Sequence, residues 1–474
     1  MAVRFVIVGG GPAGNSAATH AARLGAEVTL VERDIIGGAA HLWDCIPSKA
    51  MIATGGAMSF ARRSELFGLQ DETPPALDTA ALKARLADIE QHLHRGIVDL
   101  LESQGVRMVL GCGRLKGPHE IVVETDDGIE ELEAEAILLA TGSRPRIPDW
   151  CSPDGERVLT TRQAYPPPEI PEHLVVVGSG VTGVEFVHMF SSFGSKVTLI
   201  VSRQQVLPTK DPEVAAALED DFLRRGVVLL KGARATAIDK GGDGGGGGHG
   251  GDGGGGGEGD GGGGVVVLCD DGRRAAGSHA LLAIGAVPNS QGLGLEAAGV
   301  EVAPSGHVPI NHHCQSNVAH IYAAGDLSGK LPLSSVGAMQ GRKIAEHVMG
   351  MHTREHRHLD YDKAASAIFT EPEIADVGLA EADAFAVGRK IRVTKVPFAA
   401  SAKALINSDP RGFVKILSDP ATGVVLGGSI VGRHAAELIS VIALAVTSGL
   451  KVGDIVDSLL VHPTLSEALA DAAE

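Results

Sequence analysis

The sequence predicts an α/β protein with two Rossmann-like nucleotide-binding domains followed by a C-terminal α+β domain. The pattern GxGxxG occurs twice, at residues 9–14 and 178–183, and each copy follows a short β-branched run and precedes a helix-favouring stretch. A change in composition near residue 350 marks a further region with strand-like runs at residues 390–397 and 412–417. With 474 residues, the chain is long enough for about three domains.

The first nucleotide site is expected at the end of a strand over residues 3–8. Its glycines permit a tight turn, close approach of a pyrophosphate and close packing of helix on strand, and the helix N-terminus offers N–H groups to phosphates. A second strand at residues 27–31 leads to a carboxylate that can accept the ribose hydroxyls. The residues expected to bind the dinucleotide here are Gly9, Gly11, Pro12, Ala13, Gly14, Glu32 and Arg33.

The second nucleotide site is expected after a strand over residues 174–177. The strand that follows, residues 196–201, ends without the acid that an NAD-preferring site presents, and Arg203 can instead accept a 2'-phosphate. A solvated loop cation is the alternative reading of that arginine. The residues expected at this site are Gly178, Gly180, Val181, Thr182, Gly183, Ser202 and Arg203.

Charge and composition exclude several classes of partner. The formal net charge of −17 argues against general attraction to nucleic acid or to an anionic membrane. No apolar run approaches the roughly 18 residues of a membrane span, and none reads as a signal peptide. The five cysteines are scattered without metal-binding spacing. We therefore expect a soluble, cytoplasmic protein with no nucleic-acid partner and no stable membrane insertion.

Residues 37–49 read GGAAHLWDCIPSK, and this stretch resembles the redox-active helix of the flavoprotein disulfide reductases, which runs GGTCxNxGCxPSK. Further matches to that family are ATG at residues 140–142, AAGD at 323–326, ALLAIGAVPN at 280–289 and HPTxxE at 462–467. The family commonly has an arginine where Ala286 stands, so one of these matches is incomplete. The resemblance covers essentially the whole chain.

The resemblance implies FAD in the first site and NAD(P)H, as cosubstrate, in the second. It divides the chain into an FAD-binding domain of residues 1–150 and 280–350, an NAD(P)H-binding domain of residues 151–279 and an interface domain of residues 351–474 that forms a homodimer. Asp326 is expected to hold the ribityl hydroxyls of FAD. The further cofactor-binding residues that it implies are Gly38, Ala39, Lys49, Gly113, Thr141, Gly142, Ser334 and Gly285.

The resemblance also implies the catalytic residues. Lys49 and Glu185 are expected to form an ion pair beside the flavin nitrogen that accepts hydride, and Cys45 to lie near the flavin on the opposite face. His462, oriented by Glu467, is expected to reach across a twofold axis into the partner's active site as an acid and base.

One departure from the family pattern decides the expected reaction. Ala40 stands where the first cysteine of the redox disulfide belongs, so Cys45 has no partner in its helix. The leading hypothesis is an FAD-dependent NAD(P)H:quinone oxidoreductase, in which electrons pass directly from FAD to a quinone-type acceptor. The alternatives are a single-thiol disulfide reductase or peroxidase that uses Cys45 with His462, a protein like dihydrolipoyl dehydrogenase, and a non-catalytic nucleotide-binding subunit.

Two other segments complete the prediction. Apolar residues at helical spacing predict a long helix within residues 77–104, on which His92 and His94 are expected to be surface residues, and no metal site is predicted. Residues 241–264 contain nineteen glycines and are expected to form a flexible connection between two strands.

Overall fold

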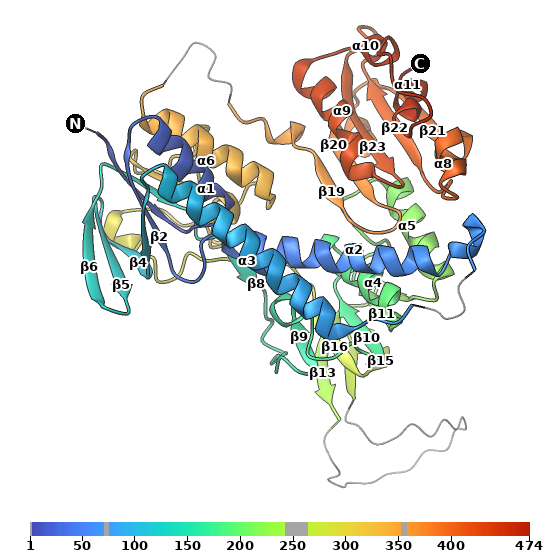
Figure 1. The fold of residues 1–474 in the computed structure, drawn as a ribbon, viewed down its shortest axis with the longest axis horizontal. Helices are drawn as coiled ribbons and strands as arrows, with labels where there is room; N and C mark the ends of the chain where they lie inside the picture. The colour runs from blue at the N-terminus through green and yellow to red at the C-terminus, as the bar shows by residue number, and fades with distance from the viewer. Residues whose placement is uncertain (1, 71–74, 242–263, 352–357) are drawn as a thin grey trace.

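The computed structural model describes residues 2–70, 75–241, 264–351 and 358–474. Figure 1 shows two α/β domains joined by the long helices α2 (Cys45–Ala61) and α3 (Thr79–Ser103), with the C-terminal domain set apart from the first of them. The predicted fold class is confirmed. The helix expected within residues 77–104 is α3, which begins after Asp78, whose carboxylate accepts the N–H groups of Ala80 and Ala81.

The first domain is built on a five-stranded parallel sheet. Alternate residues of β1 face opposite sides, so that Phe5 and Ile7 pack against the helices α1 and α6 while Val6 and Val8 pack beneath a three-stranded antiparallel sheet. The parallel strands, in spatial order, are β18 (Ile321–Ala323), β7 (Ala136–Leu139), β1 (Arg4–Val8), β2 (Glu27–Glu32) and β3 (Arg107–Leu110). The other elements are α1 (Pro12–Arg23), α6 (Ser334–Val348), β4 (Cys112–Gly117), β5 (Glu120–Thr125) and β6 (Gly128–Glu133).

The second domain repeats this plan. Its parallel sheet has the order β12 (Val228–Lys231), β11 (Lys196–Val201), β10 (His173–Val177), β16 (His279–Leu282) and β9 (Val158–Thr160). Helices α4 (Val181–Phe193) and α5 (Pro212–Arg224) pack with it, and β13 (Ala235–Lys240), β14 (Val265–Cys269) and β15 (Arg274–Gly277) form an antiparallel sheet. Strands β13 and β14 pair as a hairpin, while the glycine tract between them, residues 242–263, lies outside the described residues.

Two short strands, β8 (Ser143–Pro145) and β17 (Ala286–Pro288), pair where the chain passes between the two domains. Strand β16 continues the second sheet across the boundary predicted between residues 279 and 280. We therefore propose that the second nucleotide-binding domain extends to about residue 283, and otherwise keep the predicted division.

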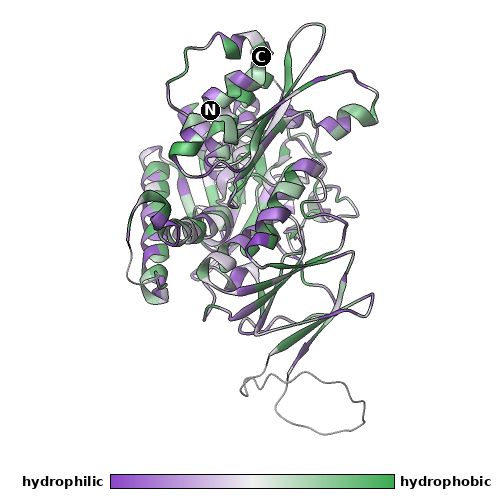
Figure 2. Ribbon diagram, turned by 90° about the vertical axis from the view of Figure 1, so that its right-hand side faces the viewer, coloured by the Kyte–Doolittle hydropathy of each residue, from purple (hydrophilic) through white to green (hydrophobic). Residues whose placement is uncertain are grey.

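The C-terminal domain contains a five-stranded antiparallel sheet in the order β19 (Ser366–Ile368), β20 (Ile374–Gly378), β23 (Val425–Val431), β22 (Phe413–Ser418) and β21 (Arg392–Pro397). Helix α9 (Ala435–Ser448) packs on it through Leu438, Ile439 and Ile442, and α11 (Glu467–Ala473) adds Leu469 to the same core. Figure 2 shows hydrophobic residues along the strands and alternation of hydrophobic and hydrophilic residues on the helices, as expected of helices with one buried face.

An ion-pair network fastens the C-terminal domain to the helices below it. Glu371 accepts from Arg411 at 2.8 Å and from Arg63, just after α2, at 2.6 Å, and Arg411 also pairs with Asp221 of α5 at 2.8 Å. Burial opposes ionisation of Glu371, but the two guanidinium groups outweigh it and lower the pKa of this carboxyl to about 2.

Glu371→Gln is expected to lower the free energy of unfolding at pH 7 by about 3 kcal/mol, the equivalent of the pKa shift. Because the folded-state pKa lies below the unfolded one, this stabilisation is present above about pH 4.5 and is lost as the pH falls towards 2. The melting temperatures of both proteins should therefore approach one another as the pH falls from about 4.5 towards 2. Glu296→Gln, at an exposed position, is the control, and its difference in melting temperature from the wild type is expected to stay constant with pH. A constant difference for Glu371→Gln as well would contradict the assignment of Glu371 to the ion-pair network.

Candidate active site

The first glycine turn has the geometry of a dinucleotide site. Gly9 has φ +112°, and a Cβ on Gly14 would overlap the carbonyl oxygen of Gly9, so both positions require glycine. Gly11 precedes α1 and has open space where a Cβ would point. No side chain caps the N-terminus of α1, so its first N–H groups remain available to phosphate oxygens. The predicted residues Pro12 and Ala13 form the first turn of this helix.

Glu32 ends β2 directly over this turn. Its two carboxylate oxygens accept the N–H groups of Gly10 at 2.6 Å and of Asp34 at 2.8 Å. Arg33 forms a surface ion pair with Asp34 at 3.0 Å. Gly113 of β4 lies against Val31 near the end of β2, where a Cβ would come within 3.0 Å of that side chain. The roles of these residues in binding stay predictions. The hydrogen bond to Gly10 holds Glu32 beside the glycine turn, where the ribose is expected.

The stretch that begins at Gly37 folds back onto the same turn. The N–H of Gly37 donates to the carbonyl of Gly10 at 2.8 Å, and Gly38, at φ +68°, lies so close to Gly11 that a Cβ would come within 2.5 Å of its Cα. Ala39 then leads into a π-helical turn, Ala40–Asp44, in which the N–H of Cys45 donates to the carbonyl of Ala40. The alanine at position 40 therefore lies one turn before Cys45.

Cys45 begins α2 and its side chain is accessible to solvent. All five cysteines fall within the described residues, and all five are free. The protein atoms packed around the Cys45 thiol raise its pKa, while the cation of Lys49 and the hydroxyl of Ser334 act in the opposite direction. In this single chain Cys45 is thus a thiol rather than a thiolate at neutral pH.

The predicted pair of Lys49 and Glu185 is present. Lys49 Nζ lies 2.7 Å from Glu185 Oε2, with 31% of the lysine side chain exposed but only 7% of the glutamate. The other carboxylate oxygen of Glu185 accepts the N–H of Phe369 at 3.0 Å, and Lys49 Nζ lies 4.9 Å from the centre of the Phe369 ring. Sequence reasoning missed Phe369, which brings the C-terminal domain into the site.

Asp326 lies in a short 3-10 turn, Gly325–Ser328, at the end of β18. Ser143 Oγ donates to its carboxylate at 2.5 Å, a contact that sequence reasoning missed. The adjacent Thr141 donates to the carbonyl of Asn289 at 2.9 Å, and Gly142 has φ +67°. The ATG and AAGD segments, far apart in sequence, are thereby brought to one edge of the first sheet.

The second glycine turn repeats the first. Gly178 has φ +111°, a Cβ on Gly183 would overlap the carbonyl oxygen of Gly178, and Gly180 has open space before α4. Val181 and Thr182 form the first turn of that helix. Val201 at the end of β11 is buried, and the Ser202 and Arg203 that follow it are exposed. Gly285, at φ +93°, follows β16 and has open space beside it.

The predicted dyad also forms. His462 Nδ1 lies 2.7 Å from Glu467 Oε1, and Glu467 Oε2 accepts the N–H of Thr464 at 2.8 Å. These two hydrogen bonds lower the pKa of Glu467, the one from Thr464 more. The His462 side chain is 73% exposed. Helix α11, which Glu467 begins, lies on the outer part of the C-terminal domain, well away from the start of α2 (Figure 1), so this chain does not bring His462 to its own Cys45.

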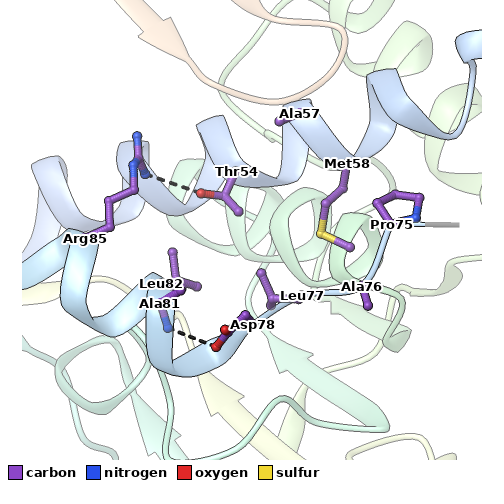
Figure 3. A pocket seen from close by; sticks show the side chains of 10 residues that line it. All are labelled: Thr54, Ala57, Met58, Pro75, Ala76, Leu77, Asp78, Ala81, Leu82 and Arg85. Carbon is purple, nitrogen blue, oxygen red and sulfur yellow. Dashed lines mark hydrogen bonds between the residues drawn. The ribbon is translucent and has the colours of Figure 1, made fainter.

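A cavity of about 370 Å³ lies between α2 and the start of α3, lined by Thr54, Met58, Leu77, Leu82 and Arg85 among others (Figure 3). Thr54 is nine residues beyond Cys45 along α2, or about 13 Å at the helical rise, so this cavity is separate from the predicted flavin site. Arg85 bridges the two helices by donating to the Thr54 hydroxyl at 3.3 Å.

Five histidines bear on the prediction that the chain has no metal site. His92 is exposed, as expected, and His94 Nδ1 lies 2.9 Å from the carbonyl of Ile36. Within the described residues, however, His312, His313 and His358 come together with all three ligand atoms within 4.8 Å of one another. The adjacent histidines at 312–313 and the histidine-rich run after residue 346 are the signals that could have indicated this cluster.

The residues present fit two dinucleotides. Each glycine turn leaves space at its middle glycine and uncapped N–H groups at a helix start. The side-chain oxygen of Asn15, in the first turn of the helix at the FAD site, is buried without a hydrogen-bond partner among the described residues. Among the described helices, none has both the length and the hydrophobicity that crossing a membrane requires.

Comparison with known proteins agrees with this geometry. Residues 3–341 match the pyridine nucleotide-disulphide oxidoreductase family, and residues 364–473 match the dimerisation domain of the same family. An NAD(P)H dehydrogenase (quinone) of Mycobacterium tuberculosis is 39% identical over 100% of this chain and 94% of its own length. A dihydrolipoyl dehydrogenase of Zymomonas mobilis is 32% identical over 99% of this chain and 96% of its own length.

Among solved structures, LpdA from Mycobacterium tuberculosis is similar with a TM-score of 0.90 and 38% identity, over 99% of each chain. The protein described here is a flavoprotein oxidoreductase that uses FAD and NAD(P)H. The chain belongs to the pyridine nucleotide-disulphide oxidoreductase family.

Proposed function

We propose that this protein is an NAD(P)H:quinone oxidoreductase that passes electrons to its acceptor without a redox disulfide. The observation that carries the proposal is the combination of a complete Lys49–Glu185 pair with an alanine at position 40. FAD, when bound, accepts a hydride from NAD(P)H and passes two electrons on. With no second sulfur in the helix of Cys45, the electrons must leave to an acceptor that diffuses in.

Lys49 and Glu185 prepare the site for this transfer. The buried carboxylate fixes the ammonium group of Lys49 at 2.7 Å and is itself fixed by the N–H of Phe369. A cation held in this way needs little reorganisation when charge moves beside it, which is the main source of electrostatic stabilisation in enzymes. The ammonium group of Lys49 also lies 4.9 Å from the centre of the Phe369 ring, at a distance that suits a cation–π contact.

The acceptor is proposed to be a quinone. A relative that shares 39% of its residues across the whole chain is named an NAD(P)H dehydrogenase (quinone), whereas a dihydrolipoyl dehydrogenase shares 32%.

We propose that the active unit is a homodimer in which His462 of each chain serves the partner's site. The His462–Glu467 pair is assembled but faces outwards in the single chain. Apolar side chains are exposed on the same domain, among them Leu444, Leu459 and Val461, and an exposed apolar surface of this kind suits a subunit interface. An imidazole held by a carboxylate can give a proton to a reduced quinone at neutral pH.

The retained dyad favours one alternative, a single-thiol reductase in which Cys45 cycles through a mixed disulfide or a sulfenic acid. A histidine from the partner could lower the pKa of the Cys45 thiol in the dimer, opposing the effect of burial. This alternative requires Cys45 for turnover, while the quinone reaction does not.

Steady-state oxidation of NADPH with a benzoquinone, and separately with lipoamide, tests the proposal. Rapid oxidation that depends on the quinone, and no oxidation with lipoamide, is expected. Turnover with lipoamide but not with the quinone would contradict the proposal. Absence of turnover with either acceptor would favour a non-catalytic nucleotide-binding subunit.

Arg203→Ala is expected to raise KM for NADPH about tenfold and to leave KM for NADH unchanged. The exposed guanidinium at the end of β11 is placed to pair with the 2'-phosphate, which NADH lacks. Initial rates with the two nucleotides measure this, and Gln204→Ala, the exposed neutral neighbour, is the control. Equal KM values for NADPH in the wild type and in Arg203→Ala would identify Arg203 as a solvated surface cation.

A further inference from the structure

Three histidines outside the flavin and nucleotide sites converge on one point of the surface. His312 and His313 belong to the turn that leads into β18, and His358 is the first described residue after α6 and residues 349–351. Their ring centres are 4.1 Å apart for His312 and His313, 4.4 Å for His312 and His358, and 5.2 Å for His313 and His358. Two parts of the chain that are far apart in sequence therefore bring imidazoles into contact.

The turn is built so that two consecutive histidines point the same way. The side-chain oxygen of Asn311 accepts the N–H groups of His313 at 2.8 Å and of Gln315 at 3.0 Å, which closes the turn. Cys314 completes it at φ +63°, a conformation that non-glycine residues adopt rarely. The ring of His347 stacks on that of His313 with ring centres 4.4 Å apart, and the Tyr322 hydroxyl lies 2.7 Å from His347 Nδ1.

We propose that His312, His313 and His358 bind a divalent transition metal ion of the zinc type. Imidazole is a preferred ligand of Zn²⁺, Cu²⁺ and Ni²⁺. Three nitrogens on a tetrahedral Zn²⁺ lie about 3.4 Å apart at the usual Zn–N length, so ligand atoms already within 4.8 Å need only small side-chain rotations. His312 and His358 are exposed and His313 is half-buried, which leaves a path for entry and room for a water molecule as the fourth ligand.

A metal ion at this point would fasten His358, and with it the residues that lead to β19, to the FAD-binding domain. Tyr361, three residues after His358, accepts a hydrogen bond from Gln340 Nε2 at 2.9 Å, and Gln340 Oε1 accepts the N–H of Gly325 at 2.8 Å, beside Asp326. The metal site is thus connected to the predicted FAD contact through two side chains. The proposal does not depend on the identity of the electron acceptor.

The test uses the full-length, FAD-loaded protein without an affinity tag, first treated with a chelator and then titrated with Zn²⁺ alone in competition with a chelating dye. One zinc ion per chain is expected. The variants His312→Gln and His358→Gln are each expected to weaken binding by at least about tenfold, because each removes one ligand. His307→Gln is the matched control, since this half-buried histidine, whose Nδ1 lies 2.9 Å from the Ser305 hydroxyl, belongs to no cluster of three among the described residues.

A second measurement guards against variants that perturb the fold. Co²⁺ in place of Zn²⁺ is expected to give visible absorption in the wild type and in His307→Gln, but not in His358→Gln, while flavin absorbance and NADPH oxidation without added metal stay the same in all three. Absence of a stoichiometric zinc site in the wild type would overturn the proposal, and so would equal binding by the wild type, His312→Gln and His358→Gln.

Discussion

Gly183→Ala is expected to abolish reduction of the flavin by NAD(P)H while leaving FAD bound. A Cβ at this position would overlap the carbonyl oxygen of Gly178, so α4 must move away from the turn that is predicted to hold the pyrophosphate. A displacement of about 1 Å near a reacting site can cost about 100-fold in rate. Stopped-flow measurement at one NADPH concentration should therefore show a loss of about 100-fold or more.

Two controls separate this effect from general unfolding. The first glycine turn is untouched, so the variant should retain its flavin absorbance and still be reduced by dithionite. Gly96→Ala, in the exposed middle of α3 with open space around it, should keep the wild-type rate and gain about 0.5–1 kcal/mol of stability. A normal rate of reduction in Gly183→Ala would contradict the assignment of the second site.

Glu185→Ala is expected to slow hydride transfer by about 10- to 100-fold and to destabilise the fold by about 3 kcal/mol. The substitution leaves the ammonium group of Lys49 without its partner and the N–H of Phe369 without its acceptor. Both effects follow from one carboxylate that is 7% exposed. Stopped-flow flavin reduction measures the first effect, and thermal unfolding measures the second.

Glu185→Gln separates the two effects. The amide oxygen can still accept the N–H of Phe369, but the amide nitrogen then faces the ammonium group of Lys49. Only part of the stability should therefore return, while the lost charge should keep transfer slow. If Glu185→Gln transfers hydride as fast as the wild type, the charge of the pair plays no part in the reaction.

Most of the structural features that could be predicted from the sequence depend on local constraints. The glycine turns at residues 9–14 and 178–183 could be located because a tight turn beneath a helix leaves no room for a side chain at Gly14 or Gly183. The long helix α3 could be predicted because its apolar residues follow the helical period. The pairing of Lys49 with Glu185 was predicted from family resemblance, since 136 residues separate them.

The parts that were missed depend on contacts between distant segments. Phe369 approaches Glu185 across 184 residues, and Ser143 approaches Asp326 across 183, and neither spacing leaves a periodic signal. The cluster of His312 and His358 joins residues that are 46 positions apart in sequence. The pairing of β16 with β10 and β9 is likewise a contact between distant segments, and our proposed boundary near residue 283 rests on it.

The most direct test of the central claim is anaerobic reduction of the protein with NADPH, followed by addition of a benzoquinone, lipoamide or hydrogen peroxide while flavin absorbance is recorded. We expect the quinone alone to reoxidise the reduced flavin rapidly. The rate should be nearly the same in Cys45→Ser, because no sulfur takes part. Reoxidation by lipoamide or peroxide that disappears in Cys45→Ser would contradict this expectation and would make this protein a single-thiol reductase.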